Sequence, residues 1–599
     1  NVKVEEREIQ CPGEVYANQV AYRKNGFKEF LLRFGNDNVV QFLDQDGKVA
    51  YSAIPGESSF FAAGGVRVRP VEFTGLDKVG SYIVRQGADT IYKDLVVTDA
   101  PYEDILKASL KFFYYQRASM DLDSVYAGVY KRSAGHLDTA VRAHTSTGDD
   151  RVFNSGKGWY DAGDYGKYIV NSGITTYTLL ALYEHYPNYF KSLKWNIPEE
   201  GNLPDLLAEI KYNLDWMLTM QAPDGGVYHK VSGLAFPKTV MPVDDTGKRY
   251  AIGKSVTATY DFAAVMAKAY RVYKKFDAVF AEKCLSAAER AYAWAGFNPE
   301  ALYYANPVGV ETGAYEDADA SDEYQFASTE LYVVTGNPDY KTVGVSGDVP
   351  SWQNVYGLAN YDKSVYKDKY GASAYEKLIA TADKLVENAS KGFMVPMTSD
   401  DYVWGSNAVA ANQGVWLLHA YYMTEDERYY NAAVNVVDYL LGENPLGMSF
   451  VTGFGSNSPQ NPHHRISQAD RIKAPVPGML VGGPQNKDNS DVGSSCSYSR
   501  TYPATAYYDN SCSYATNEVA INWNAPLAYL VGALEALATG ETPTFAEIPV
   551  YTGSSSSSSV VSSSSQAKSS SSVAPSSSSQ AKSSSSVAPS SSSVKSSSS

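Results

Sequence analysis

Helical segments recur along the chain between about residue 101 and residue 545, and long Gly-, Asn- and Pro-rich stretches separate them. In each segment apolar residues return at helical spacing, which predicts a helix with at least one buried face. The clearest predicted helices span residues 206–220, 258–273, 278–294, 375–389, 407–422, 428–441 and 524–537. Roughly ten helices of this kind are too many for a four-helix bundle. We therefore predict a closed array of helix pairs whose long loops carry the function.

Residues 1–100 show a different pattern, because apolar and polar residues alternate there in short runs between turn residues. The runs predicted as strands span residues 15–22, 29–34, 39–43, 66–69, 82–84 and 93–97. Short strands at this spacing are typical of an immunoglobulin-like β-sandwich. The region holds a single cysteine, so the disulfide of true immunoglobulin domains cannot form within it and the prediction rests on the strand pattern.

The end of the chain has a third composition. Residues 562–575 are repeated as residues 576–589, and Ser dominates this region. Such a segment cannot bury enough apolar surface to offset the entropy that ordering would cost. We therefore predict a sandwich at residues 1–100, a helical domain at residues 101–545 and a disordered Ser-rich linker at residues 546–599.

Charge and composition limit the partners that the chain can have. The net charge of −15 argues against nucleic acid or an anionic membrane and favours a neutral substrate. No apolar run is long enough to cross a membrane. The 48 Tyr residues suit a saccharide-binding cleft, although many must simply be half-buried at the surface.

The four cysteines form no CxxC metal-binding pattern. Cys496 and Cys512 flank a Ser- and Tyr-rich segment and are candidates for a loop disulfide, which would indicate an oxidising compartment. Spacing alone does not decide whether this bridge forms, because the Cα geometry is unknown.

Two carboxylates stand three residues apart at Asp161 and Asp164, within the aromatic- and Gly-rich stretch 158–168. Asp and Gly favour a turn here, and the apolar spacing predicts a helix from Tyr165 onward. Two interpretations are open. An Asp at the start of a helix is often only a cap, whereas paired acids with aromatic neighbours are the equipment of sugar chemistry.

A second cluster is formed by His463, His464 and Arg465 in a chain that has only seven His residues. These side chains can donate hydrogen bonds to sugar hydroxyls or to a carboxylate, or they can anchor a polar loop. A metal site is disfavoured, because adjacent residues in an extended segment point in opposite directions.

A third cluster surrounds Glu518, which lies among apolar and amide residues just before a predicted helix. Burial there would raise the pKa of Glu518 and keep it protonated near neutral pH, as a general acid requires. A position at the helix start would instead lower this pKa. The sequence by itself does not choose between the two.

Together the three clusters resemble glycoside hydrolase family 9, the cellulase family with an (α/α)6 barrel. The residues that match its histidine signature are Ser449, Val451, Thr452, Gly455, Asn457, Pro462, His463 and Arg465. The residues that match its acidic signature are Tyr507, Asp509, Tyr514, Glu518, Ala520, Asn524 and Ala525. Asp161–Asp164 matches its Asp-Ala-Gly-Asp element. The resemblance covers about residues 101–542 and implies a mostly α fold, an (α/α)6 barrel preceded by a small all-β immunoglobulin-like sandwich.

The resemblance implies inverting endo-acting hydrolysis of β-1,4-glucosidic bonds in a single displacement. Asp164 would be the base that activates water, Asp161 would help to hold that water, and Glu518 would be the acid that protonates the leaving oxygen. The residues implied to bind or support the substrate are His463, Arg465, His229 and Asp509. The candidate sugar-stacking residues are Trp159, Tyr160, Trp404 and Tyr514.

The implied partner is cellulose or another β-glucan, such as xyloglucan or mixed-linkage glucan. The choice between endo and exo action, and among these glucans, stays open. A catalytically silent carbohydrate-binding relative is disfavoured, because all three acids are present. We expect a secreted monomer without an organic cofactor.

Two metal sites of the family bear on this chain. Some relatives with the N-terminal sandwich bind zinc through a Cys/His cluster shortly before Asp-Ala-Gly-Asp, but residues 126–138 contain no Cys. Calcium is commoner in the family, and the acidic stretch 317–323 offers oxygen ligands at Asp319, Asp322 and Glu323. The same stretch can be read as an acidic helix start. Residues 487–508, just before the acidic cluster, form a longer loop than the family usually has.

Overall fold

The computed structural model describes residues 14–33, 38–493 and 496–553. The chain divides into two compact units, residues 1–551 and 552–599, and the following description concerns the first. The Ser-rich linker predicted at residues 546–599 lies outside the described residues from residue 554 onward. Among the described helices, none is long and apolar enough to span a membrane.

The described residues between 14 and 98 form two mostly antiparallel sheets, which confirms the predicted all-β N-terminal region. One sheet has the order β1-β3-β7-β6, with the strands β1 (Glu14–Tyr16), β3 (Glu29–Arg33), β7 (Val66–Glu72) and β6 (Ser59–Phe61). The other has the order β2-β9-β8-β4-β5, with β2 (Tyr22–Arg23), β9 (Asp89–Thr98), β8 (Gly80–Gln86), β4 (Val40–Leu43) and β5 (Val49–Ala53). Fully buried Phe30, Phe42 and Phe73 pack against one another in the core of this region.

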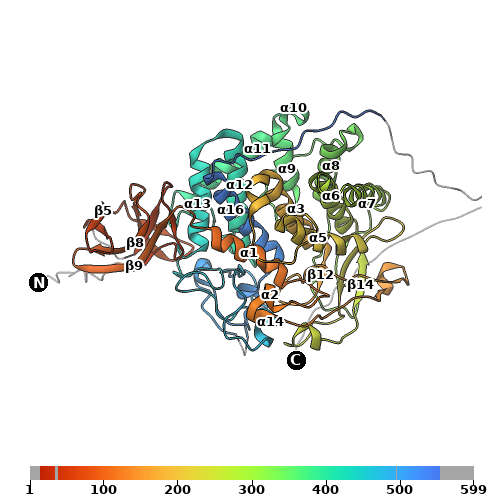
Figure 1. The fold of residues 1–599 in the computed structure, drawn as a ribbon, viewed down its shortest axis with the longest axis horizontal. Helices are drawn as coiled ribbons and strands as arrows, with labels where there is room; N and C mark the ends of the chain where they lie inside the picture. Colours follow the sequence, from red (N-terminus) through yellow and green to blue (C-terminus); the bar gives the residue numbers. More distant parts are fainter. Residues whose placement is uncertain (1–13, 34–37, 494–495, 554–599) are drawn as a thin grey trace, which may run out of the picture. The chain divides into compact units, whose positions relative to one another are not determined.

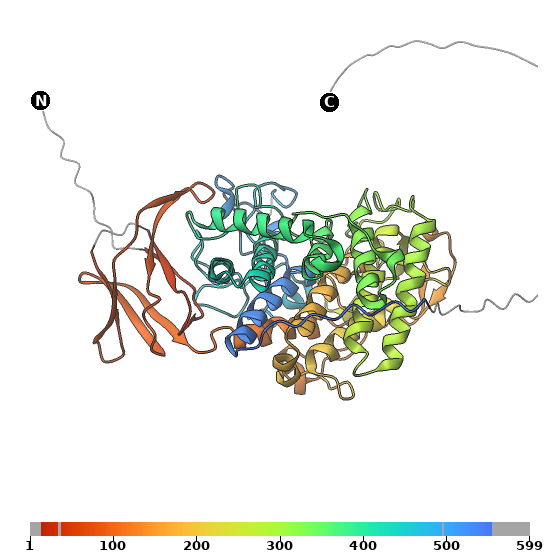
Figure 2. The same cartoon turned by 90° about the horizontal axis from the view of Figure 1, so that it is seen from above.

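Six helices form an inner ring in the part of the chain after residue 100. They are α3 (Ile169–His185), α6 (Val256–Tyr273), α8 (Ser321–Thr335), α9 (Tyr356–Val365), α12 (Ser406–Thr424) and α16 (Ile521–Ala538). Each packs against the next, and α16 returns to α3, with aromatic contacts joining α9 to α12. The outer helices are α1 (Glu103–Tyr115), α5 (Asp205–Thr219), α7 (Ala278–Phe297), α11 (Ser373–Ala389) and α13 (Glu427–Leu440). The fold is the predicted (α/α)6 barrel, shown beside the sandwich strands in Figures 1 and 2.

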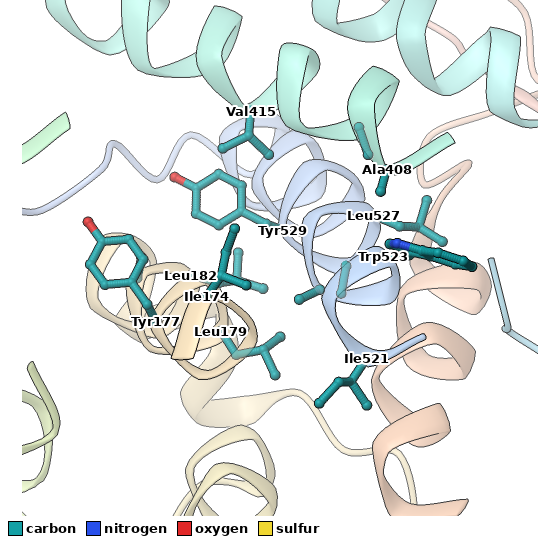
Figure 3. Packing of buried hydrophobic residues seen from close by; sticks show 14 of the residues in the cluster. Ile174, Tyr177, Leu179, Leu182, Ala408, Val415, Ile521, Trp523, Leu527 and Tyr529 are labelled. Atoms are coloured by element: carbon teal, nitrogen blue, oxygen red, sulfur yellow. The ribbon is translucent and has the colours of Figure 1, made fainter. Parts of the chain in front are cut away.

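The inner helices are buried along nearly their whole length, as expected of helices with apolar residues on every face. Figure 3 shows Ile174 and Leu182 of α3, Val415 of α12 and Tyr529 of α16 converging in this core. Burial of such side chains is the main source of the stability that holds the loops at the ends of the helices.

Short elements occupy the connections between these helices. The short α-helices are α2 (Ser124–Ala127), α4 (Pro187–Ser192), α10 (Lys367–Tyr370), α14 (Arg465–Ala469) and α15 (Tyr514–Asn517). The 3-10 turns are η1 (Gly128–Tyr130), η2 (Thr145–Thr147), η3 (Pro242–Asp244), η4 (Pro338–Tyr340) and η5 (Pro503–Thr505).

A third sheet, which the sequence did not indicate, lies in the loops of the barrel. Its order is β11-β10-β14-β13-β12, with β11 (Val152–Phe153), β10 (Val141–Ala143), β14 (Tyr250–Lys254), β13 (Tyr228–Ser232) and β12 (Lys167–Tyr168). Because β12 pairs with β13, helix α3 begins at Ile169 and the prediction of a helix from Tyr165 is wrong. Asp161 and Asp164 therefore lie in a loop before a strand, and neither caps the helix.

The sandwich meets the barrel through buried polar side chains. The Asn18 amide donates to the Asp438 carboxyl at 2.7 Å, and Asn435 donates to Glu29 at 3.4 Å. Burial raises the pKa of Glu29 to about 8 and that of Asp438 to about 7, and it raises the pKa of buried Glu443 well above its usual range. These acids therefore prefer the neutral form in the folded protein.

The Glu29→Gln variant should lose less stability than the wild type as pH rises. Unfolding restores the ordinary pKa of Glu29 near 4.5, so the stability that its neutral form provides is complete below that pH and is lost as pH rises through about 8. Melting temperatures measured between about pH 5 and about pH 9 should fall less in the variant. Glu57→Gln, at an exposed carboxyl that does not contribute to the raised pKa of Glu29, is the control, and equal slopes in all three proteins would contradict the prediction.

Candidate active site

The loop that carries Asp161 and Asp164 is held from both sides by hydrogen bonds to its backbone. The buried Gln116 amide, just past α1, donates to the carbonyl oxygens of Tyr160 and Ala162 at 3.3 and 2.9 Å. At the start of α16, the Ile521 N–H donates to the Asp161 carbonyl at 2.8 Å. The loop is thus fixed between the first and last long helices of the barrel.

The Asp161 carboxylate is buried and accepts two hydrogen bonds from residues outside its loop. Asn171 donates to it at 2.8 Å and the Tyr315 hydroxyl at 2.6 Å. Burial raises the pKa of Asp161 to about 7, and the nearby Asp164 contributes to this rise. No sequence pattern indicated Tyr315, which has a φ of +50°, a strained backbone conformation for a Tyr.

One oxygen of the Asp164 carboxylate is held by hydrogen bonds. Its Oδ2 atom accepts from the Gly166 N–H at 3.0 Å and from the Tyr168 hydroxyl at 3.3 Å. The side chain is nearly buried, and it lines a cavity of about 290 Å³. A carboxylate oriented in this way can accept a proton from a small molecule such as water.

Glu518 lies between α15 and α16 and outside both helices, so the helix-start alternative does not apply. Its half-buried carboxyl accepts a hydrogen bond from the Gly163 N–H at 3.3 Å. Burial raises the pKa of Glu518 well above its usual range, with further contributions from Asp164 and Asp161. The folded protein therefore favours the protonated form of Glu518, the state in which a carboxyl can donate a proton.

Gly163 allows the three clusters to meet. A Cβ atom at this position would lie 2.2 Å from the His463 carbonyl oxygen and 3.1 Å from the Glu518 carboxyl. In the other direction, the Gly163 carbonyl accepts from the Arg465 backbone N–H and from its guanidinium, both at 3.0 Å. The backbone of the Asp161–Asp164 loop thus contacts both the His463–Arg465 cluster and Glu518.

The His463 ring is oriented by the acidic segment. Its Nδ1–H donates to the Ser511 carbonyl at 2.6 Å, and its backbone N–H donates to the Asn517 carbonyl at 2.8 Å. Burial lowers the pKa of His463, so the ring is neutral. Asp509 accepts the backbone N–H groups of Gln460 and Asn461 at 2.8 and 2.9 Å, and it thereby positions the loop that leads to His463.

His464 and Arg465 are anchors within the protein. The buried His464 ring donates to Gln116 at 3.0 Å. The Arg465 guanidinium donates to the carbonyl oxygens of Gly163 and Pro237 and lies 5.5 Å from the Phe236 ring. Backbone carbonyl groups accept from its Nε and Nη1 atoms, and the expectation that Arg465 binds sugar hydroxyls stays a prediction that would involve its other N–H groups.

His229 also differs from the expectation that it binds substrate. It is fully buried, accepts from the Ser255 hydroxyl, donates to the Ala314 carbonyl at 2.9 Å and stacks on Tyr303. Burial lowers its pKa to about 3. Because Ala314 precedes Tyr315, His229 supports the segment that carries the Tyr315 hydroxyl instead of facing a ligand.

The candidate sugar-stacking residues fall into two groups. Trp159 and Tyr160 are fully buried, with Trp159 donating to Glu209 at 2.9 Å, so the prediction that they stack on sugar is wrong. Trp404 is 40% exposed, and its ring lies 5.4 Å from that of Tyr514. The Tyr514 ring lies 5.9 Å from His463, which places this pair beside the candidate catalytic groups.

A further aromatic residue, Trp352, was missed because its sequence surroundings carry no recognised pattern. Its ring lies 5.0 Å from that of Tyr315, which contacts Asp161, and its side chain is only half-buried. Lys230 was missed as well. Its buried amine donates to the Gly313 carbonyl at 2.6 Å and fastens the segment that precedes Tyr315.

Cys496 and Cys512 form a disulfide, which settles the question that the spacing left open. Cys512 directly follows Ser511, the residue whose carbonyl accepts the His463 ring N–H. The bridge therefore ties the long loop before the acidic segment to the backbone that orients His463. Among the described cysteines, Cys284 is buried and unpaired.

Asp322 and Glu323, two of the three expected calcium ligands, share a side-chain hydrogen bond. Asp319 accepts from the Ser321 backbone and hydroxyl, and Asp322 accepts from the Val355 N–H at 2.7 Å. The Glu323 carboxyl is buried beside Asp261, which contributes to raising its pKa. Within residues 14–33, 38–493 and 496–553, no group of three or more His, Cys, Asp or Glu side chains is arranged to hold a metal ion. Calcium binding at this stretch stays a prediction, and no step of the chemistry is assigned to a metal.

The Gly163→Ala variant should lose most of its activity, because the added methyl group would overlap the His463 carbonyl and push the Asp161–Asp164 loop away from Glu518. We expect kcat to fall at least tenfold and the melting temperature to drop. Gly296→Ala is the matched control, since a Cβ there meets no atom within 4 Å. Activity equal to that of the control would show that the close approach is not required.

Comparison with known proteins agrees with this geometry. The model of the glycosyl hydrolase family 9 matches residues 102–531. The xyloglucan-specific endo-β-1,4-glucanase BoGH9A of Bacteroides ovatus is 39% identical, over 87% of this chain and 93% of its own length. Endoglucanase D of Acetivibrio thermocellus is 32% identical, over 87% of this chain and 83% of its own.

Among solved structures, the Bacteroides ovatus GH9 protein superposes with a TM-score of 0.80 at 37% identity, covering 88% of this chain and 99% of that chain. The family match, the sequence relatives and the fold thus agree over the whole barrel. The chain is a glycoside hydrolase and belongs to glycosyl hydrolase family 9.

Proposed function

We propose that the protein is an inverting endo-β-1,4-glucanase that cleaves cellulose or a related β-glucan in one displacement. The observation that carries this proposal is the hydrogen bond from the Gly163 N–H to Glu518. It brings a carboxyl with a raised pKa next to the loop of Asp161 and Asp164, so that acid and base can act on opposite sides of one bond.

In the proposed reaction, Glu518 gives its proton to the glycosidic oxygen as the bond to the anomeric carbon breaks. Asp164 takes a proton from the water that attacks this carbon from the opposite face, and the configuration inverts. Asp161, held by Asn171 and Tyr315, helps to orient that water. Because Glu518 must be protonated, activity declines once the pH rises far enough to ionise it.

The remaining residues support binding and placement. Aromatic faces for sugar rings near the acid and base are offered by Trp352, Trp404 and Tyr514. Neutral His463 keeps its Nε2 atom for a glucose hydroxyl, since Nδ1 is used by Ser511. Asp509 acts through His463 as a positioning residue.

The name of the Bacteroides ovatus relative makes xyloglucan a substrate to test beside cellulose and mixed-linkage glucan. The disulfide favours an oxidising compartment, which supports our proposal that the protein is secreted. We propose that it acts as a monomer.

The Glu518→Gln and Asp164→Asn variants should each lower kcat on a soluble β-glucan by about 10²- to 10⁴-fold, because each removes one proton transfer. Asp339→Asn, at an exposed carboxylate in η4, is the control and should match the wild type. Circular dichroism of all variants checks that the fold is unchanged.

NMR of fresh products from a cello-oligosaccharide tests the stereochemistry. Early accumulation of the α-anomer is expected for a single displacement, and the β-anomer would overturn it. A wild-type protein that binds cello-oligosaccharides without cleaving them would support the alternative of a silent carbohydrate-binding relative.

A further inference from the structure

The cavity that Asp164 lines extends away from the proposed acid Glu518. It has a volume of about 290 Å³, and besides the catalytic-loop residues 164–166 its walls come from residues 232–235, Pro237, Asp245, residues 247–250 and Thr312. Glu518, His463 and Tyr315 do not line it. The cavity therefore opens on the side of Asp164 that these groups do not cover.

Several of its polar walls are rigid. Asp245 accepts from the His136 ring at 3.0 Å, and Arg249 donates to buried Asp138 at 2.9 Å. The Ser232 hydroxyl lies 2.9 Å from that of Thr312. Because these contacts fix the walls, the cavity is a preformed site.

Other polar groups in the wall remain available to a ligand. The Tyr250 hydroxyl and the Lys248 amine make no hydrogen bond or ion pair with another residue in the described ranges 14–33, 38–493 and 496–553. Leu234, Ala235 and Pro237 add an apolar wall. The free hydroxyl and the amine can form hydrogen bonds with the hydroxyl groups of a sugar, and the apolar surface can contact its C–H face.

The size of the cavity limits the ligand further. Its volume is at the lower end of the roughly 300–1,000 Å³ that ligand sites have, which suits one sugar ring better than an oligosaccharide. A glucan backbone that passes between Asp164 and Glu518 would place only a substituent there. We propose that this cavity binds a single neutral monosaccharide branch of the glucan, of the pentose type carried by xyloglucan.

This inference rests on the proposed β-1,4-glucanase function, and it predicts which substrates the protein prefers. Ala235→Trp and Gly247→Phe would fill the cavity from its exposed rim, and Gly247 has no positive φ that would forbid a side chain. Lys238→Trp, on the same exposed segment but outside the lining, is the control. The substrates are a xyloglucan oligosaccharide and unbranched cellohexaose.

Both filling variants should lower kcat/KM on the xyloglucan oligosaccharide about 10-fold or more and leave kcat/KM on cellohexaose within about twofold. Lys248→Ala and Tyr250→Phe should also lower kcat/KM on the xyloglucan oligosaccharide more than on cellohexaose, by smaller factors than the filling variants. The control should match the wild type on both substrates, and equal melting temperatures would show that all variants fold.

Four results would overturn the inference. Equal losses of kcat/KM on both substrates would show that the cavity binds the glucan backbone. No loss on either substrate would show that the cavity holds only solvent. A wild-type protein that cleaves cellohexaose but not the branched substrate would also refute it while the proposed function stands. If the wild type cleaves neither substrate, the proposed function fails, and the inference fails with it.

Discussion

The missing side chain at Gly163 is the constraint on which the site depends. Two loops about 300 residues apart in sequence approach so closely that a Cβ atom would lie 2.2 Å from a backbone oxygen. This contact lets one backbone position bond Glu518 through its N–H and Arg465 through its carbonyl. The barrel makes such an approach durable, because its buried inner helices hold the ends of both loops.

Burial of the acids lowers the stability of the fold but favours the protonation state that the chemistry needs. Asp161 and Glu518 are removed from water, and Arg465 is the cation whose charge offsets part of the rise in the pKa of Glu518. The folded state therefore favours the protonated carboxyl that an acid needs. The strained backbone of Tyr315 adds to this cost, which the large apolar core offsets.

Elements and site residues could be predicted from the sequence where apolar residues recur at a regular spacing or where a local motif exists. The seven helices with the clearest apolar spacing were predicted to within a few residues because that spacing extends over many turns, whereas α8 and α9 of the inner ring were not among them. Strand β5 was missed because it is mostly exposed, and β6 because it has three residues. Trp159 was misplaced because an aromatic beside an acid looks the same in sequence whether it faces solvent or core. Tyr315 and Trp352 could not be found, since only the folded chain brings them to Asp161.

The loops of the site are joined mostly through backbone atoms. Ile521 bonds the Asp161 carbonyl, His463 bonds the Asn517 carbonyl, and Gly482 bonds the Glu518 carbonyl, all through main-chain N–H groups. Main-chain bonds survive most changes of side chain. Side chains on the rim of the site can therefore change, and with them the preferred glucan, while the reacting groups keep their places.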